Sequence, residues 1–140
     1  MTVQAVLLPL FVQVLLMLGL LYWMAYLRTG AFRRGEVRAA DIALGQPNWP
    51  AHMTQVANAF RNQFELPVLF FVLVILAWIT RKADLLFVIL SWVFVLSRLA
   101  HAYVHVTTNQ VSPRGLIYGI GGLVLTIMWI IFMLRILLSF

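Results

Sequence analysis

The chain has 140 residues, of which 64% are hydrophobic and only 10% are charged, so it has too little polar surface to cover an ordinary soluble domain. Its formal net charge of +6 would suggest nucleic-acid binding in a soluble protein. It contains no cysteine, which excludes disulfides, thiolate metal sites and a cysteine nucleophile. Any thiol chemistry would therefore use a thiol brought in by a ligand.

Long apolar runs predict an all-α membrane protein, a four-helix up-down bundle forming a single domain over residues 1–140. The expected helices cover about residues 3–27, 51–80, 84–106 and 114–139. The first run is long enough to cross a hydrocarbon core of roughly 30 Å. We do not expect it to be a signal peptide, because it lacks a positive N-terminal flank and a small-residue cleavage site.

The second run is strictly apolar only over residues 66–79, which is too short to cross a membrane alone. Its polar first half must therefore enter the membrane or lie along its surface. We expect one continuous helix over residues 51–80, preceded by a turn that contains Pro47 and Pro50. Pro67 removes the hydrogen bond to the Gln63 carbonyl, which leaves two interpretations open: a kink or a free carbonyl beside the polar layer, and a proline that serves packing alone.

The basic residues lie mainly at the ends of the apolar runs, so we attribute the net charge to membrane orientation rather than to nucleic-acid binding. The second loop holds Arg81 and Lys82. The first and third loops hold Arg28, Arg33, Arg34, Arg38 and Arg114. The positive-inside rule then predicts that these two loops are cytoplasmic and that both termini are outside.

Unusual polar residues on three of the expected helices fall at one depth. Glu65 lies 16 residues before Arg81, and Arg98 lies 16 residues after Lys82. At about 1.5 Å per residue, both lie roughly 24 Å from the second loop, just beneath the opposite membrane surface. The predicted polar layer contains Asn58, Arg61, Asn62 and Glu65 on the second helix, Arg98, His101 and His105 on the third, and Arg114 and Tyr118 on the fourth.

Spacings of three and four residues predict three helix faces, which carry Asn58, Asn62 and Glu65, then Arg98, His101 and His105, then Arg114 and Tyr118. One interpretation is that Glu65 pairs with Arg98 or Arg61 to hold the helices together. That pairing leaves several arginines unmatched, with Arg33 or Arg34 close above the layer, and unpaired charges inside a membrane are unfavourable. We therefore favour a binding site for a ligand that carries several carboxylates and one amine.

Two blocks of sequence are distinctive. One is ANAFRNQFELP, from Ala57 to Pro67, and the other is Arg98-Leu-Ala-His101 followed by Pro113-Arg114 and Tyr118. Together with the Arg33-Arg34 pair, they resemble the second-helix motif and the third-to-fourth-helix motif of the MAPEG family, the membrane-associated proteins of eicosanoid and glutathione metabolism. The chain looks like a bacterial-type member, and the resemblance covers nearly its whole length.

This resemblance implies a homotrimer in the bacterial inner membrane, with glutathione bound as cosubstrate between neighbouring subunits at the cytoplasmic side. Catalytic members conjugate or isomerise lipophilic electrophiles, using an arginine at the start of the fourth helix to stabilise the thiolate. By the same matching, that role falls on Arg114, and Asn62, Glu65, Arg98 and Tyr118 become ligand contacts. We also expect Glu65 to lie within salt-bridge reach of Arg98 or of an arginine from a neighbouring subunit. The expected partners are further copies of the chain, lipids and a lipophilic small molecule, with no nucleic acid.

The chain also departs from the family pattern. Asn58 stands where better-known glutathione-binding members have an arginine, His105 stands where several have a tyrosine, and Gly115 stands where some have a serine. Asn58 removes one expected carboxylate partner. Two alternatives to a glutathione enzyme therefore stay open: use of another thiol, and a non-catalytic scaffold or partner subunit that binds lipid or another membrane protein.

His101 and His105 are four residues apart and could bind a metal or haem from one helix face. Zinc sites normally need three or four protein ligands, and only His52 remains elsewhere in the chain. We expect no metal site, and we favour hydrogen bonding of both histidines within the bundle.

Overall fold

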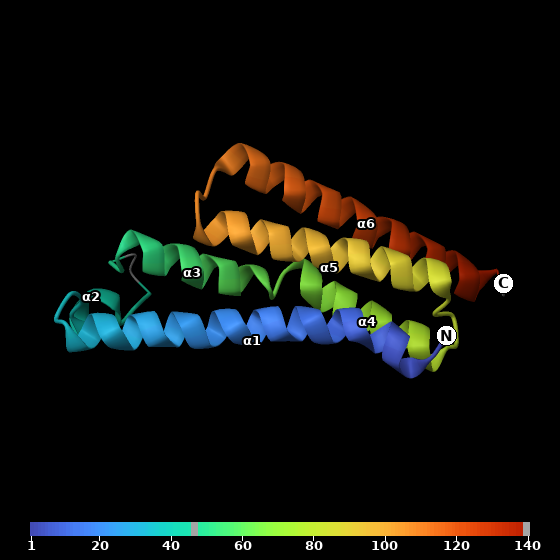
Figure 1. Cartoon of the computed structure of the whole chain (residues 1–140), viewed down its shortest axis with the longest axis horizontal. Coiled ribbons are helices and arrows are strands. Elements are labelled where there is room, and N and C mark those ends of the chain that lie inside the picture. The colour runs from blue at the N-terminus through green and yellow to red at the C-terminus, as the bar shows by residue number, and fades with distance from the viewer. Residues whose placement is uncertain (46–47, 139–140) are drawn as a thin grey trace.

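The computed structural model describes residues 1–45 and 48–138, and every regular element in these ranges is a helix (Figure 1). The helices are α1 (Val3–Arg33), α2 (Ala39–Ile42), α3 (Ala51–Asn62), α4 (Leu66–Ile79), α5 (Leu85–Val106) and α6 (Val111–Leu137). In the described chain, four stretches are long and apolar enough to cross a membrane. Three of them are the single helices α1, α5 and α6, and the fourth is formed by α3 and α4 together. The predicted all-α membrane architecture is confirmed.

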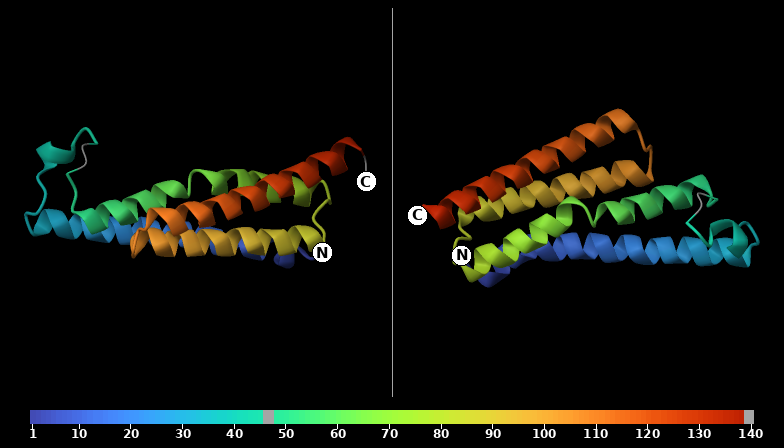
Figure 2. Two further views of the ribbon diagram at one scale, coloured as in Figure 1. Left: turned by 90° about the horizontal axis from the view of Figure 1, so that it is seen from above. Right: turned by 180° about the vertical axis from the view of Figure 1, so that it is seen from behind.

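The spanning helices lie side by side along one axis and alternate in direction (Figures 1 and 2). Both termini and the α4–α5 turn lie at one end of the bundle, which we call the terminal end (Figure 1). The opposite end, which we call the polar end, carries α2 and the α5–α6 turn. Helix α5 contacts α1, α3 and α6, while α4 contacts α1 and α6.

The main apolar core lies toward the terminal end. It includes Val6 of α1, Phe70 of α4, Phe94 of α5 and Met128 of α6, all almost fully buried. The rings of Phe70 and Phe94 stack with their centroids 4.8 Å apart. Helix α6 buries residues only from Gly121 onward, so its second half belongs to this core and its first half stands away from α5 (Figure 1).

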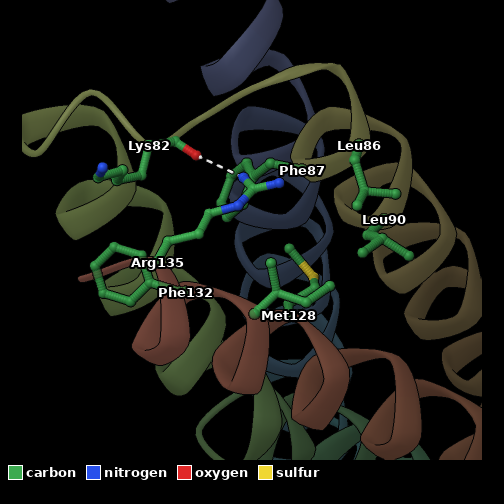
Figure 3. Close-up of a pocket in the computed structure, with 8 residues that line it drawn as sticks. Lys82, Leu86, Phe87, Leu90, Met128, Phe132 and Arg135 are labelled. Atoms are coloured by element: carbon green, nitrogen blue, oxygen red, sulfur yellow. Dashed lines mark hydrogen bonds between the residues drawn. The ribbon is translucent and has the colours of Figure 1, made fainter. Parts of the chain in front are cut away.

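A charged clamp joins α6 to the start of α5 at the terminal end. Arg135 of α6 forms an ion pair of 2.7 Å with Asp84 and donates a hydrogen bond of 3.2 Å to the Lys82 carbonyl (Figure 3). Asp84 also caps α5 by accepting from the Phe87 backbone N–H. Apolar side chains, including Met128, pack beside Arg135 (Figure 3). The hydrogen bond from Arg135 holds the pKa of the Asp84 carboxyl below its ordinary value.

Helix α1 is longer than predicted, because it continues to Arg33 instead of ending at residue 27. Ala31, in the added turns, is fully buried and packs with Val37 and Met53. Tertiary packing therefore continues the helix past the end of its apolar run.

Helix α6 begins at Val111, earlier than the predicted residue 114. Pro113 fits within its first turn, where a backbone N–H has no partner in the helix. Pro50 is the N-cap of α3, in line with the predicted turn. The predicted helix end at residue 139 and the turn residue Pro47 lie outside the described residues.

The prediction of one continuous helix over residues 51–80 is wrong, because residues 63–65 interrupt it between α3 and α4. The backbone N–H groups of these residues donate three residues back instead of four. Glu65 then leaves the helical region, with φ −94° and ψ −105°. Pro67 lies in the first turn of α4 and offers no N–H to the Gln63 carbonyl, and the helix is broken here rather than kinked.

Candidate functional site

The polar layer lines an open cavity of about 500 Å³ at the polar end of the bundle. Its lining residues are Asn58, Arg61, Asn62, Glu65, His101, His105, Val111, Arg114, Gly115 and Tyr118. They come from α3 and the turn after it, from the end of α5 and from the start of α6. The predicted layer is therefore brought together, with Arg98 just outside the cavity lining.

A chain of hydrogen bonds connects three sides of the cavity. Arg98 of α5 donates to the side-chain oxygen of Asn62 at 3.3 Å. The Asn62 amide donates to one carboxylate oxygen of Glu65 at 3.0 Å, and the Tyr118 hydroxyl of α6 donates to the other at 3.1 Å. The carboxylate is therefore positioned both by the turn after α3 and by α6.

We predicted that Glu65 forms a salt bridge with Arg98 or with an arginine of a neighbouring subunit. Within residues 1–45 and 48–138, Glu65 has no ion pair, and Asn62 connects it to Arg98 through hydrogen bonds. The reason is the break at residues 63–65, which takes Glu65 off the helical stripe on which the prediction relied. A partner from a neighbouring subunit stays a prediction.

Arg98 is a cation buried inside the bundle, with only 1% of the residue exposed. Its Nε and one terminal nitrogen have no hydrogen-bond partner among the described residues. The guanidinium lies over the Tyr118 ring, 4.9 Å from the centroid, which is a stabilising cation–π geometry. Because no anion pairs with it in the described chain, its charge adds positive potential to the neighbouring cavity.

Gly121 of α6 makes room for this arginine. A Cβ atom at this position would lie 3.0 Å from a terminal nitrogen of Arg98 and 2.6 Å from the Ser97 hydroxyl oxygen. Both distances are shorter than a normal contact, so a larger residue here would require the Ser97 and Arg98 side chains to shift.

His101 and His105 form the α5 side of the cavity. Their ring centroids are 5.5 Å apart, and the His101 ring is also 5.5 Å from the ring of Tyr118. The Nδ1 atom of His105 is buried without a partner among the described residues. The described part of the chain holds no group of three or more histidine, cysteine, aspartate or glutamate residues suited to a metal ion.

Arg114 lies in the first turn of α6, close to N–H groups that the helix leaves unpaired. Its guanidinium donates to the side-chain oxygen of Asn109, which has the left-handed φ of 53° in the α5–α6 turn. The sequence interpretation missed Asn109. Its position in a polar turn between two apolar runs was the available signal, since asparagine tolerates the left-handed region better than most residues.

Arg33 and Arg34 lie at the end of α1 and do not line the cavity. They border a separate surface depression of about 570 Å³ together with residues of α1 such as Tyr26. Arg34 forms an exposed ion pair of 2.8 Å with Glu36, and this hydrogen bond lowers the pKa of the Glu36 carboxyl. A single chain therefore does not bring these two arginines to the rest of the predicted site.

The fold and the cavity define an integral membrane protein with a polar cavity at one end of its helix bundle. A model of the MAPEG family matches residues 6–134, which include every residue that lines the cavity, and the chain belongs to this family. No curated protein and no solved structure matched the chain.

Proposed function

We propose that this protein is a membrane-embedded transferase or peroxidase that uses glutathione, or a similar thiol, against lipophilic electrophiles. Membership of the MAPEG family is consistent with a glutathione-related transferase of membranes. The observation that carries the proposal is the charge of the cavity. Arg61 and Arg114 line it and the incompletely bonded Arg98 lies beside it, while Glu65 is the one carboxylate among its lining residues.

Glutathione has carboxylates, an ammonium group and a thiol, and the cavity offers groups that suit each of them. Arg61 and Arg98 would bind carboxylates, for which a guanidinium is the best-matched side chain. Glu65 would accept a hydrogen bond from the ammonium group. A cavity of about 500 Å³ also lies within the usual size range of small-molecule sites.

Arg114 would stabilise the thiolate. Its guanidinium stays charged at neutral pH, and the start of α6 adds partial positive charge beside it. A nearby cation favours the thiolate, which is the nucleophilic form of a thiol. The thiolate sulfur then forms a bond to an electrophilic carbon of the lipophilic substrate, and the leaving group departs with the electrons of the broken bond. With a hydroperoxide, the thiolate sulfur bonds to the terminal oxygen as the O–O bond breaks, which gives a sulfenic acid and, after protonation of the alkoxide, an alcohol. A second thiol then reduces the sulfenic acid, forming a disulfide and water.

We further propose that the protein is a homotrimer in the bacterial inner membrane, with the polar end in the cytoplasm and both termini outside. The basic residues of the first and third loops support this orientation. The open side of the cavity and the distance of Arg33 and Arg34 from it support a ligand site between neighbouring subunits.

One observation favours the alternative, a non-catalytic scaffold or partner subunit. Both carboxylate oxygens of Glu65 already accept hydrogen bonds from Asn62 and Tyr118. This carboxylate is therefore less available to the ammonium group of a ligand than a free one would be.

The direct test compares Arg114→Ala with Arg38→Ala, an exposed arginine of the first loop that lies outside the cavity. Glutathione binding and conjugation of a generic aromatic electrophile are measured in detergent. We expect Arg114→Ala to fold and to lose activity by on the order of a hundredfold, as when a preorganised electrostatic donor is removed. Arg38→Ala should keep wild-type activity.

Equal turnover by the wild type and Arg114→Ala would show that Arg114 does not stabilise the thiolate. If the wild type neither binds glutathione nor turns over, the scaffold function takes its place.

A further inference from the structure

Two glutamines are buried against each other between α1 and the break that follows α3. Gln13 is 0% exposed and Gln63 is 1% exposed. The Gln13 side-chain nitrogen donates to the Gln63 side-chain oxygen, and the Gln63 side-chain nitrogen donates to the Ala59 carbonyl at 3.0 Å. Neither residue lines the cavity. A polar side chain buried in a membrane-spanning helix is unfavourable without a hydrogen-bond partner, because hydrocarbon supplies none. Such residues commonly have a structural or functional role.

The Gln63 side chain replaces a backbone hydrogen bond that the break removes. In a regular helix the Gln63 backbone N–H would donate to the Ala59 carbonyl, four residues earlier. Here it donates to the Phe60 carbonyl instead. The Ala59 carbonyl receives the Gln63 side chain, so it stays bonded while the helix is broken. Pro67 explains only the missing donor to the Gln63 carbonyl further along.

Gln13, which lies on α1, holds the Gln63 side chain in this position. Its side-chain oxygen has no partner among the described residues, so the bond to Gln63 is the polar contact that this side chain makes there. Asn62, which directly precedes Gln63 at the end of α3, and Glu65, two residues after Gln63, both line the cavity. The orientation of the break therefore determines where their side chains point.

We propose that Gln13 is a positioning residue that locks the break between α3 and α4 and so sets the placement of Asn62 and Glu65 in the cavity. The effect of Gln13 on ligand binding rests on the proposed function. Its effect on the geometry of the break, which we call the lock, does not. The competing explanation is that the two glutamines simply attach α1 to its neighbour, as polar residues do between membrane helices. In that case, removing Gln13 would lower stability and leave the break unchanged.

The test measures the geometry of the break without using thiol binding. Since the chain has no cysteine, paired spin labels can be attached through Ala51→Cys on α3 and Ile75→Cys on α4, both at exposed positions. Labelled chains are diluted with unlabelled ones, so that pairs between subunits do not contribute. Gln13→Leu removes the donor at similar size, and Gln4→Leu changes an exposed glutamine of the same helix as the control.

We expect the distance distribution between the labels to shift or broaden in Gln13→Leu and to stay unchanged in Gln4→Leu. A distribution in Gln13→Leu that matches the wild type overturns the lock, whatever happens to stability. If Gln13→Leu does not fold, the double variant Gln13→Leu/Gln63→Leu carries the same test. It leaves neither glutamine side chain without its partner, and the Ala59 carbonyl, which loses the Gln63 side chain, can regain its helical backbone donor only if the break closes. An unchanged distribution in that variant also overturns the lock.

Glutathione affinity separates this inference from the proposed function. If the wild type binds glutathione, Gln13→Leu should bind it more weakly by on the order of tenfold, because misplaced contact groups bind poorly. If the labels move in Gln13→Leu but the wild type binds no glutathione, the lock stands and the proposed function fails.

Discussion

Arg98 and Gly121 show how one missing side chain can admit a buried charge. The arginine has one hydrogen bond to Asn62 and the ring face of Tyr118, with no anion paired to it in the described chain. Such an arrangement is costly unless the surroundings fit the guanidinium closely. The close approach of α6 at Gly121 supplies that fit, because the space a Cβ would fill is occupied by Ser97 and Arg98.

Gly121→Ala should therefore destabilise the protein by about 1–3 kcal/mol through overpacking. The control is Gly122→Ala, where an added Cβ would meet Leu66 at an ordinary 3.8 Å. Alanine stabilises a helix interior by up to about 1 kcal/mol relative to glycine, so the control should be neutral or slightly more stable. Thermal unfolding of both variants in detergent measures the difference, and equal melting temperatures would contradict the close fit.

At this scale the sequence predicted the cavity residues that share a helix face. Asn58 and Arg61 on α3, and His101 and His105 on α5, lie together because helical spacing and depth are local properties. Arg33 and Arg34 could not be placed in this way. Their position depends on how far α1 continues, which packing of Ala31 decides and which hydropathy does not record.

At the scale of elements, the apolar runs located the spanning helices, because the bilayer requires long apolar segments with satisfied backbones. In the sequence, only Pro67 indicated the break after α3. The break also involves Gln63 and its hydrogen-bond partner Gln13 on α1. These two residues are 50 positions apart in the sequence, so no local pattern indicates their contact. Contacts between elements are thus the part of this fold that pattern alone does not reveal.

The clamp between Asp84 and Arg135 should make stability depend on pH. Since the pKa of Asp84 is lowered in the folded state, the pair stabilises the fold above the unfolded-state pKa of about 4. That contribution is lost as the pH falls through the folded-state value. Because the Asp84 side chain is 49% exposed, we expect at most about 1 kcal/mol.

Asp84→Asn tests this, because asparagine keeps the N-cap of α5 and removes the charge. The wild type should melt at a higher temperature than Asp84→Asn at pH 7, and the two should converge as the pH falls from about 4 through the lower folded-state pKa of Asp84. A gap that is the same at every pH would mean that the ion pair contributes nothing.

At the scale of the whole molecule, the two ends of the bundle differ in how they are held. The terminal end has the apolar core and the clamp, which fix α6 against α5. At the polar end, α6 buries no residue before Gly121, and the cavity opens there. A single chain thus combines a packed scaffold with a site that is open on one side. This arrangement suits a ligand held between subunits.

If neighbouring subunits complete the site, two inactive variants should restore activity when mixed. One carries Arg114→Ala, and the other carries Arg33→Ala and Arg34→Ala, whose side chains lie outside the cavity of their own chain. Each variant alone should have low conjugation activity. In a heterologous trimeric ring, an interface joining an intact Arg114 to an intact Arg33–Arg34 pair should form at about a quarter of all sites after random mixing in equal amounts, and at about a third of the sites in mixed trimers alone.

Co-expression of the two variants with different tags allows the mixed oligomers to be purified and assayed, with native mass measurement to establish whether they are trimers. Separately purified proteins that are mixed without subunit exchange serve as the control, and they should show only the sum of the low activities. In purified mixed trimers, restoration to roughly a third of wild type requires that the two arginine groups act across an interface. Mixed oligomers whose conjugation activity does not rise would mean that both arginine groups act within one subunit, or that Arg33 and Arg34 take no part in the site. In either case the proposed arrangement between subunits would be wrong.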